Sequence, residues 1–349
     1  MLFVLFASVC SAAEVKFEVR EPQGIARHSW PVTSGIPFAK GALKDPSQVR
    51  LVDGQEKPVS LQTEALSRWQ DGSVKWLLLD FQTSLRPKQV KRFRLTTTVT
   101  NKKLNATDRK LAVSRNKRGV AIDTGRLRVH LNRRSFRLLD HVWLDKNKDG
   151  KYSNDERVSS AKGAGILLRT PDGQTFRADL SKATMKIEQA GPWRACVRIS
   201  GKHVAKTKHL FSYVLRVTAF RNKPYLKLSY TFVNDDTANM MTSIKSLSLD
   251  FAVNGKANQY VTNGRPTPPT RLYQVDDQSF EIDGKKSGKR ALGWAAIAGD
   301  QGGVAVGLPE FWENWPKSLE TKGSQLSVGI CPQFKTGRYD GRPLKEECK

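Results

Sequence analysis

Residues 211–234 read FSYVLRVTAFRNKPYLKLSYTFVN, and this stretch indicates the fold class of the chain. Apolar and polar residues alternate on both sides of the tetrapeptide RNKP, in which Asn222 and Pro224 are typical turn residues. Because successive side chains of a β-strand point to opposite faces, this alternation predicts two antiparallel strands joined by a hairpin turn.

The same alternation recurs along most of the chain. Positions that should share one face of a strand are Val15, Phe17 and Val19 in one segment, and Leu127, Val129 and Leu131 in another. Residues 293–308, GWAAIAGDQGGVAVGL, predict a second hairpin with its tip at residues 300–303. Apolar spacing typical of a long amphipathic helix does not occur in the sequence. The sequence therefore predicts an all-β protein.

A polar segment divides the predicted strands into two groups. The 349 residues are enough for two domains, since a domain usually has roughly 100 to 200 residues. Residues 101–110, NKKLNATDRK, interrupt the alternation and contain little to bury, which is typical of a linker. Short, numerous strands favour barrels and sandwiches. We predict a smaller β domain over residues 14–105 and a larger β domain over residues 106–335, each of them a barrel or a sandwich.

The first thirteen residues, MLFVLFASVCSAA, predict export. The apolar run ends in small residues, with Ser11 and Ala13 placed as before a signal-peptidase cut. The run is too short to span a bilayer, which takes about 20 apolar residues, and it lacks a positive n-region. We therefore expect a signal peptide over residues 1–13 that is incomplete, a secreted protein (extracellular or periplasmic) and no membrane span. A lipid anchor at Cys10 is the alternative, which the bulky Val9 disfavours.

The charge of the chain predicts an anionic partner. Lys and Arg number 59 against 33 Asp and Glu, a net charge of +26. Polyuronates, nucleic acids and anionic surfaces all match such a field. Residues 86–137 hold seventeen basic residues against two acids, although basic residues on strands can also form a plain solvated face. We expect no nucleic-acid partner, because the basic stretches contain no recognisable nucleic-acid-binding motif.

The cysteines do not predict a disulfide framework. After export three remain, Cys196, Cys331 and Cys348, widely spaced and without metal or redox motifs. Cys196 lies in the strand-like stretch RACVRIS, which predicts a buried, small apolar residue.

Two stretches of the front domain combine cations with aromatic rings. They are RHSWPVTSGIPFAKGAL, residues 27–43, and QTEALSRWQDGSVKWLLLDF, residues 62–81. Cations pair with carboxylates and aromatic faces pack on sugar rings. The candidate substrate-binding residues are Arg27, His28 and Trp30, expected on one turn-rich loop, and Arg68, Trp69 and Lys75, expected around another. The alternative is a core or turn role, because Trp30, Trp69 and Trp76 belong to a residue type that is usually buried.

Together these two stretches resemble the N-terminal barrel of the exo-rhamnogalacturonan lyase family, also called PcRGLX/YetA-like. Residues 211–234 are similar to the central β-sandwich of that family, and so are GLPEFWENWPKSLE and LSVGICP further on. The resemblance implies a RIFT-related barrel followed by a sandwich. It also implies a C-terminal α/α toroid that should begin about where this sequence stops, so residues 336–349 are expected to be the start of a missing region.

The resemblance further implies a lyase acting on rhamnogalacturonan by β-elimination. That reaction removes the proton α to a uronate carboxylate, so it needs a cation, a base and an acid for the leaving group. No residue here matches a family catalytic motif, so catalytic residues are not assigned. We predict accessory β domains of a secreted polysaccharide lyase, with an acidic polysaccharide as partner. The alternative is a stand-alone carbohydrate-binding or cell-surface module; the oligomeric state is not predicted.

Residues 145–156, DKNKDGKYSNDE, have the ligand order of a calcium-binding EF-hand loop. The predicted Ca²⁺ ligands are Asp145, Asn147, Asp149, the backbone carbonyl of Lys151, Ser153 and Glu156. The eighth position holds Tyr152 instead of an aliphatic residue, three lysines reduce the negative charge, and the flanks are not paired helices. A polar turn without calcium is the alternative. If calcium binds, we expect it to rigidify the loop.

Overall fold

A computed structural model of the chain describes residues 14–97, 111–133, 137–139, 141–160, 162–163, 165–178, 183–238 and 242–333. The predicted signal peptide, the predicted linker at residues 101–110 and the expected start of a further region at residues 336–349 lie outside these ranges. The chain divides into two compact units. The barrel unit comprises Met1–Leu111 with Ala190–Ala195, and the sandwich unit comprises Ala112–Gln189 with Cys196–Lys349.

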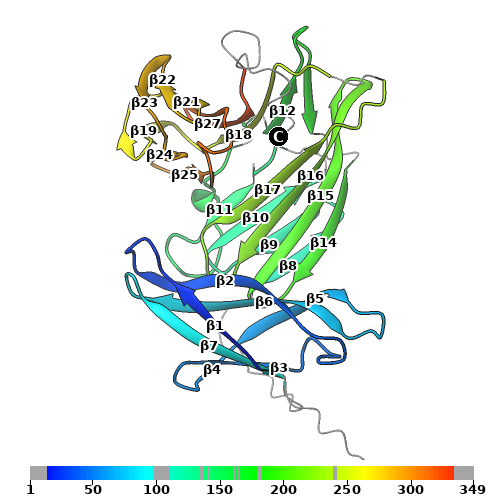
Figure 1. The fold of residues 1–349 in the computed structure, drawn as a ribbon. Coiled ribbons are helices and arrows are strands. Elements are labelled where there is room, and N and C mark those ends of the chain that lie inside the picture. Colours follow the sequence, from blue (N-terminus) through cyan, green and yellow to red (C-terminus); the bar gives the residue numbers. More distant parts are fainter. Residues whose placement is uncertain are drawn as a thin grey trace, which may run out of the picture. The chain divides into compact units, whose positions relative to one another are not determined.

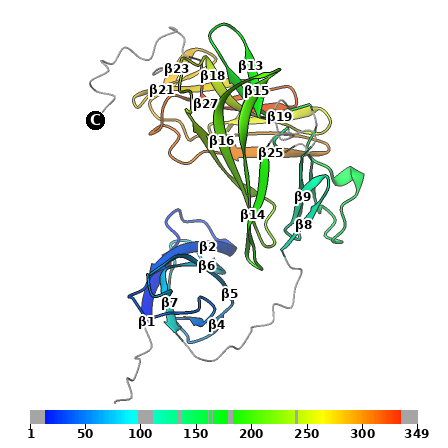
Figure 2. The same ribbon diagram turned by 90° about the vertical axis from the view of Figure 1, so that its right-hand side faces the viewer.

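The barrel unit is built from two sheets, ordered β1-β7-β3-β4 and β2-β6-β5. In Figure 2 these strands curve around a common centre. Their bounds are β1 Glu14–Arg20, β2 Arg27–Pro37, β3 Val49–Asp53, β4 Pro58–Val59, β5 Leu61–Arg68, β6 Val74–Leu85 and β7 Val90–Thr97.

The alternation of apolar residues places the core of the barrel unit. Val15, Phe17 and Val19 of β1 pack against the buried cluster as predicted. The ring of Phe17 lies 6.2 Å from that of Phe81 on β6 and 5.6 Å from that of Phe93 on β7, between centroids. Phe81 and Phe93 are 5.2 Å apart in an edge-to-face arrangement, a favoured geometry of aromatic pairs. This aromatic group therefore joins strands of both sheets.

A buried carboxylate connects two turns of the barrel unit. Glu21, which follows β1, is 3% exposed and accepts hydrogen bonds from the backbone N–H groups of Gln23, Gly24, Ile25 and Lys88. Burial by itself raises the pKa of Glu21, but these N–H donors outweigh it and bring the pKa from an ordinary 4.5 to about 2. The ionised carboxylate thus substitutes for water at N–H groups outside the strand ladders.

We expect Glu21→Gln to lower the free energy of unfolding of the barrel unit at neutral pH. The free energy of unfolding should also change less with pH in this variant than in the wild type. Because the folded pKa is depressed, the stabilisation is present above the unfolded value near 4.5 and is lost as the pH falls towards 2. Urea unfolding between these two pH values checks this. The matched control is Glu56→Gln, an exposed ion-pair partner of Arg94. If the free energy of unfolding falls equally steeply with pH in the wild type and in Glu21→Gln, the role assigned to Glu21 is wrong.

The sandwich unit contains three sheets. Their orders are β11-β10-β9-β8, then β17-β16-β15-β13-β12-β18-β27-β26-β21-β22-β23 with β14 paired to β15, and β20-β19-β24-β25. In Figure 1 the long strands β15, β16 and β17 lie side by side in green. The first strands are β8 Ala112–Asn116, β9 Gly119–Asp123, β10 Leu127–Asn132, β11 Val142–Leu144, β12 Gly165–Arg169, β13 Thr175–Ala178, β14 Thr184–Ala190, β15 Arg194–Ala205, β16 Lys208–Phe220 and β17 Leu226–Val233. The remaining strands are β18 Ser246–Ala252, β19 Ala257–Thr262, β20 Arg265–Pro266, β21 Arg271–Asp276, β22 Ser279–Ile282, β23 Lys285–Gly288, β24 Trp294–Gly299, β25 Gly302–Gly307, β26 Lys317–Lys322 and β27 Gln325–Cys331.

Both predicted hairpins are confirmed. β16 and β17 pair antiparallel from Ser212↔Val233 to Ala219↔Leu226, and Asn222 in their turn has a φ of 54°. β24 and β25 pair up to Gly299↔Gly302, so their turn is shorter than the predicted tip. The predicted inward residues of β10, namely Leu127, Val129 and Leu131, are all buried.

The all-β prediction is confirmed as well. The residues that the structure describes contain one short 3-10 helix, η1 Asn154–Glu156, and otherwise strands and loops. None of their helices has the length and apolar character needed to cross a membrane. Cys196 is buried as predicted.

Candidate functional sites

Arg27 and Trp30 lie on a strand, which corrects the prediction of a turn-rich loop. Both belong to β2, where Arg27 pairs with Leu85 and Trp30 with Thr83, so the intervening segment holds one extra residue as in a β-bulge. The Arg27 guanidinium lies 4.6 Å from the centroid of the Trp30 ring. Its Nε is also 3.5 Å from the carboxylate of Glu21. The bulge therefore brings the predicted cation and aromatic ring together, with exposed His28 between them in sequence.

Arg68, Trp69 and Lys75 form the second predicted set. The Arg68 guanidinium donates to two backbone carbonyls at 3.1 and 2.7 Å, and the Trp69 indole N–H donates to the Phe38 carbonyl at 3.0 Å. The Lys75 ammonium lies 4.6 Å from the centroid of the Trp69 ring. Because the polar atoms of Arg68 and Trp69 bind backbone, this set stabilises the turn before β6.

The structure does not join the two predicted sets into one site. Arg27 is opposite Leu85 and Arg68 is opposite Val74, which are the two ends of β6. At about 3.3 Å per residue, the eleven steps between these ends span up to roughly 36 Å along the strand.

Tryptophan exposure differs from the alternative prediction of a core role. Trp30 is 38% exposed and Trp76 is 42% exposed. Trp76 alternates along β6 with the fully buried Leu77, so it faces outward, and a Cβ atom at Gly35 would lie 3.5 Å from its ring. Trp69 is half-buried in its turn. The core interpretation is therefore wrong for Trp30 and Trp76.

The predicted calcium loop runs from the end of β11 through η1. Asp145 and Glu156, its first and twelfth residues, are 2% and 5% exposed. The Asp145 carboxylate accepts the Gly150 N–H at 3.1 Å, and the Glu156 carboxylate accepts the N–H groups of Ser153 at 3.0 Å and Lys146 at 2.8 Å. The bond from Ser153 is the main reason that the pKa of Glu156 is lowered. Both end carboxylates thus bind the loop's own backbone.

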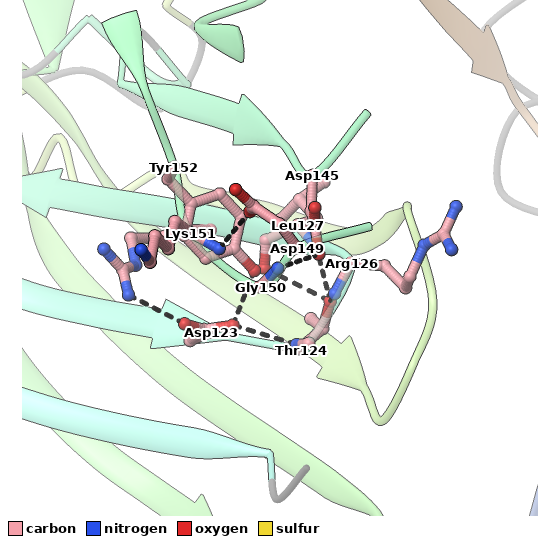
Figure 3. Close-up of polar contacts among 11 residues, drawn as sticks. Asp123, Thr124, Arg126, Leu127, Asp145, Asp149, Gly150, Lys151 and Tyr152 are labelled. Carbon is pink, nitrogen blue, oxygen red and sulfur yellow. Dashed lines mark hydrogen bonds and ion pairs between the residues drawn. The ribbon is translucent and has the colours of Figure 1, made fainter. Parts of the chain in front are cut away.

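Tyr152, the departure from the calcium motif, anchors the loop to the neighbouring sheet. Its hydroxyl donates to Asp123 on β9 at 2.7 Å, and the guanidinium of Arg128 on β10 lies 4.3 Å over its ring. Arg128 also pairs with Asp123 at 2.9 Å. Figure 3 shows Tyr152 and Asp123 facing each other, with Asp145 and Gly150 on the same loop. Burial and Asp123 raise the pKa of Tyr152, so its hydroxyl stays a donor at neutral pH.

Calcium binding stays a prediction. Across the described ranges, no three His, Cys, Asp or Glu side chains are grouped so that they could hold a metal. The six predicted ligands share one loop, and a Ca²⁺ ion needs six to eight oxygens, so all of them would have to take part. Asp145 and Glu156 would have to turn from backbone N–H groups towards the ion.

We expect Ca²⁺ to bind the wild-type chain with a dissociation constant of roughly 0.1 to 1 mM, as in extracellular calcium modules. Isothermal titration on the wild type, Asp145→Ala and Glu156→Ala measures this, and both variants should lose the heat of binding. Circular dichroism verifies that the variants remain folded. The prediction is wrong if the wild type gives no heat at millimolar calcium or if both variants bind as the wild type does.

The basic block at residues 86–137 is divided between the units. β7 belongs to the barrel unit, and β8, β9 and β10 belong to the sandwich unit. Several of its arginines pair with carboxylates: Arg92 with Glu18, Arg94 with Glu14 and Glu56, and Arg128 with Asp123. These pairs support the alternative of a solvated sheet face for part of the block. Residues 98–110 and 134–136 lie outside the described ranges.

A polar hollow in the large sheet of the sandwich unit was not predicted. It has a volume of about 430 Å³ and contains arginine and serine side chains from five neighbouring strands. The sequence signal that could have revealed it is SLSLD, residues 246–250, in which serines alternate with buried leucines. Such alternation marks a strand with one polar face, but only the sheet order assembles several of these faces into one surface.

Comparisons with known proteins agree with this architecture. The family model described as the PcRGLX-like N-terminal RIFT barrel domain matches residues 19–92. The model of the PcRGLX-like protein central beta sandwich domain matches residues 111–262 and 277–330, more than half of the chain.

A curated relative is similar to this chain over most of the chain's length. The chain is 22% identical over 360 aligned positions to the uncharacterized protein YetA of Bacillus subtilis (strain 168), covering 84% of this chain. It spans 41% of the length of that relative. The expected resemblance, with its RIFT barrel and central sandwich, is thereby confirmed. The two matched domains occur in the same order as the barrel and sandwich strands of the structure, and the chain belongs to the PcRGLX-like protein family.

Proposed function

We propose that this chain supplies accessory β domains of a secreted polysaccharide lyase acting on rhamnogalacturonan or a related acidic glycan by β-elimination. Membership of the PcRGLX-like family and the net charge of +26 support an acidic glycan as partner. The single observation that carries the proposal is the stack of Arg27 on the exposed ring of Trp30.

The Arg27–Trp30 stack combines two functions that a uronate-containing glycan needs. A guanidinium can pair with a carboxylate through two N–H groups, and an indole provides an apolar face for the C–H groups of a sugar. Arg27 is 25% exposed at its side chain and is held between Glu21 and Trp30. A side chain that is already positioned loses less conformational entropy on binding, which favours affinity.

In this proposal the two β units bind and orient glycan. β-Elimination also needs a base for the proton α to the carboxylate and an acid for the leaving oxygen. His28 follows Arg27 in the sequence and is exposed, but a histidine without a positioned substrate does not define a base. We therefore assign substrate binding to Arg27 and Trp30 and no proton-transfer role to any residue.

The second candidate function is a stand-alone carbohydrate-binding or cell-surface module. The same stack would serve it, because recognition of a glycan does not require catalysis. Sequencing the gene beyond Lys349 separates the candidates. An open reading frame that continues into a helix-rich segment favours the lyase, and a stop codon favours the module.

We expect the chain to be retarded in gels that contain rhamnogalacturonan or polygalacturonate, and less so as salt is added, since exposed charges are screened. Trp30→Ala should weaken retention by roughly tenfold, by loss of an aromatic contact at a binding site. The matched control is Trp76→Ala, which removes a similarly exposed indole from the same unit. Equal retention on neutral and acidic polysaccharide at low salt would contradict the proposal.

We also expect the 349-residue chain to release no unsaturated uronate product from rhamnogalacturonan oligosaccharides. An accessory role assigns the base and the acid to other parts of a lyase, and the described residues offer no assigned pair. Ultraviolet absorbance of the product measures this. Robust product formation would contradict the accessory role, but it would support rhamnogalacturonan as the substrate.

A further inference from the structure

We propose that the hollow in the large sheet of the sandwich unit binds a uronate-bearing oligosaccharide, with Arg169 and Arg271 as its carboxylate ligands. This inference rests on the proposed function, because it places the acidic glycan on a second surface of the chain. It differs in location, since the Arg27–Trp30 stack belongs to the barrel unit.

Antiparallel register assembles the hollow from five strands. The strands β12, β18, β27, β26 and β21 are neighbours in this order. Directly opposite residues of paired strands point to the same face. The pairs that build this face are Arg169↔Ser246, Ser248↔Gly329, Gly329↔Ser318, Ser327↔Glu320 and Glu320↔Arg271. Most residues that line the hollow therefore share one face of the sheet, and Leu247, Pro332 and Gln333 complete the lining.

Serine hydroxyls form the floor of the hollow. Ser248 and Ser318 are 8% and 7% exposed, so they lie deep in the sheet face. Gly329 lies between them in the register, and a Cβ atom there would stand 2.1 Å from the Ser318 hydroxyl oxygen. A larger residue would displace this hydroxyl, so the glycine preserves the depth of the hollow. Hydroxyls can both donate to and accept from the hydroxyls of a sugar.

Cations stand at the two ends of the hollow. Arg169 on β12 and Arg271 on β21 are separated by four strand spacings, roughly 19 Å at about 4.8 Å each. The Arg271 guanidinium lies 5.3 Å from the centroid of the Tyr273 ring, which supports its position. Within the described residues, neither guanidinium lies within 4.0 Å of a carboxylate oxygen. Both can therefore receive carboxylates of a ligand that crosses the strands.

The lining favours an oligosaccharide over other polyanions. Glu320 lines the hollow next to Arg271, and its carboxylate can accept hydrogen bonds from the hydroxyls of a sugar. Among the described residues that line the hollow there is no aromatic ring on which a nucleic-acid base could stack. A volume of about 430 Å³ lies in the range of pockets that hold a small ligand, so a short oligosaccharide fits.

The test is isothermal titration of the 349-residue chain with tetragalacturonate and with its carboxyl-reduced, neutral counterpart. Arg169→Gln and Arg271→Gln should each weaken binding of tetragalacturonate by about tenfold, as expected for a charge-assisted hydrogen bond. The control is Arg265→Gln, which removes the same charge from an exposed position of the sandwich unit outside the hollow. Gly329→Ala should weaken binding without changing the net charge.

The outcomes separate this inference from the proposed function. One outcome is that the wild type binds tetragalacturonate while the two hollow arginine variants bind it as well as Arg265→Gln does. In that case the hollow is not the binding site, and the proposal of an acidic glycan partner stands. If the hollow variants lose binding while Trp30→Ala in the barrel unit has no effect, the hollow is supported and the Arg27–Trp30 stack is not. If a single-stranded oligonucleotide or the neutral counterpart binds more strongly than tetragalacturonate, both the uronate site in the hollow and the proposed acidic glycan partner are wrong.

Discussion

The register between antiparallel strands determines which side chains share a face throughout this structure. Strand β18 pairs with β27 from Leu247↔Cys331 to Ala252↔Gln325, with one irregularity after Leu247. Because side chains alternate between faces, a slip of one residue would turn Leu249 to the polar face and Ser248 to the core. The cost of exposing leucines selects one register, and that register at the same time assembles the serines and arginines of the hollow.

Buried carboxylates serve the loops of both units in the same way. Glu21 in the barrel unit and Glu156 in the sandwich unit are nearly inaccessible, and each accepts several backbone N–H groups. Their pKa values are lowered for this reason, so they remain ionised at neutral pH. In a chain with a net charge of +26, part of the limited negative charge is thus used to stabilise turns. Much of the positive charge stays at the surface, where it can attract a polyanion.

The family, the charge and the two candidate surfaces together give a consistent view of function. The barrel unit presents a cation stacked on an exposed indole, and the sandwich unit presents a hydroxyl-lined hollow with a cation at each end. The loop at residues 145–156 is fixed by Tyr152 to β9 and β10, so its conformation depends on the sheet as well as on its own turn residues.

The alternation of residue types was enough to predict the fold class, both hairpins and the inward residues of β1 and β10, because a period of two reflects local backbone geometry. Motif order also identified the loop from Asp145 to Glu156, although not the tyrosine anchor that replaces its aliphatic position. The alternation could not reveal that Arg27 stacks on Trp30 across a bulge, that Arg68 binds backbone, or that Arg169 and Arg271 share one face. These facts depend on which strands are neighbours, and strand order is set by long-range packing that no local pattern encodes.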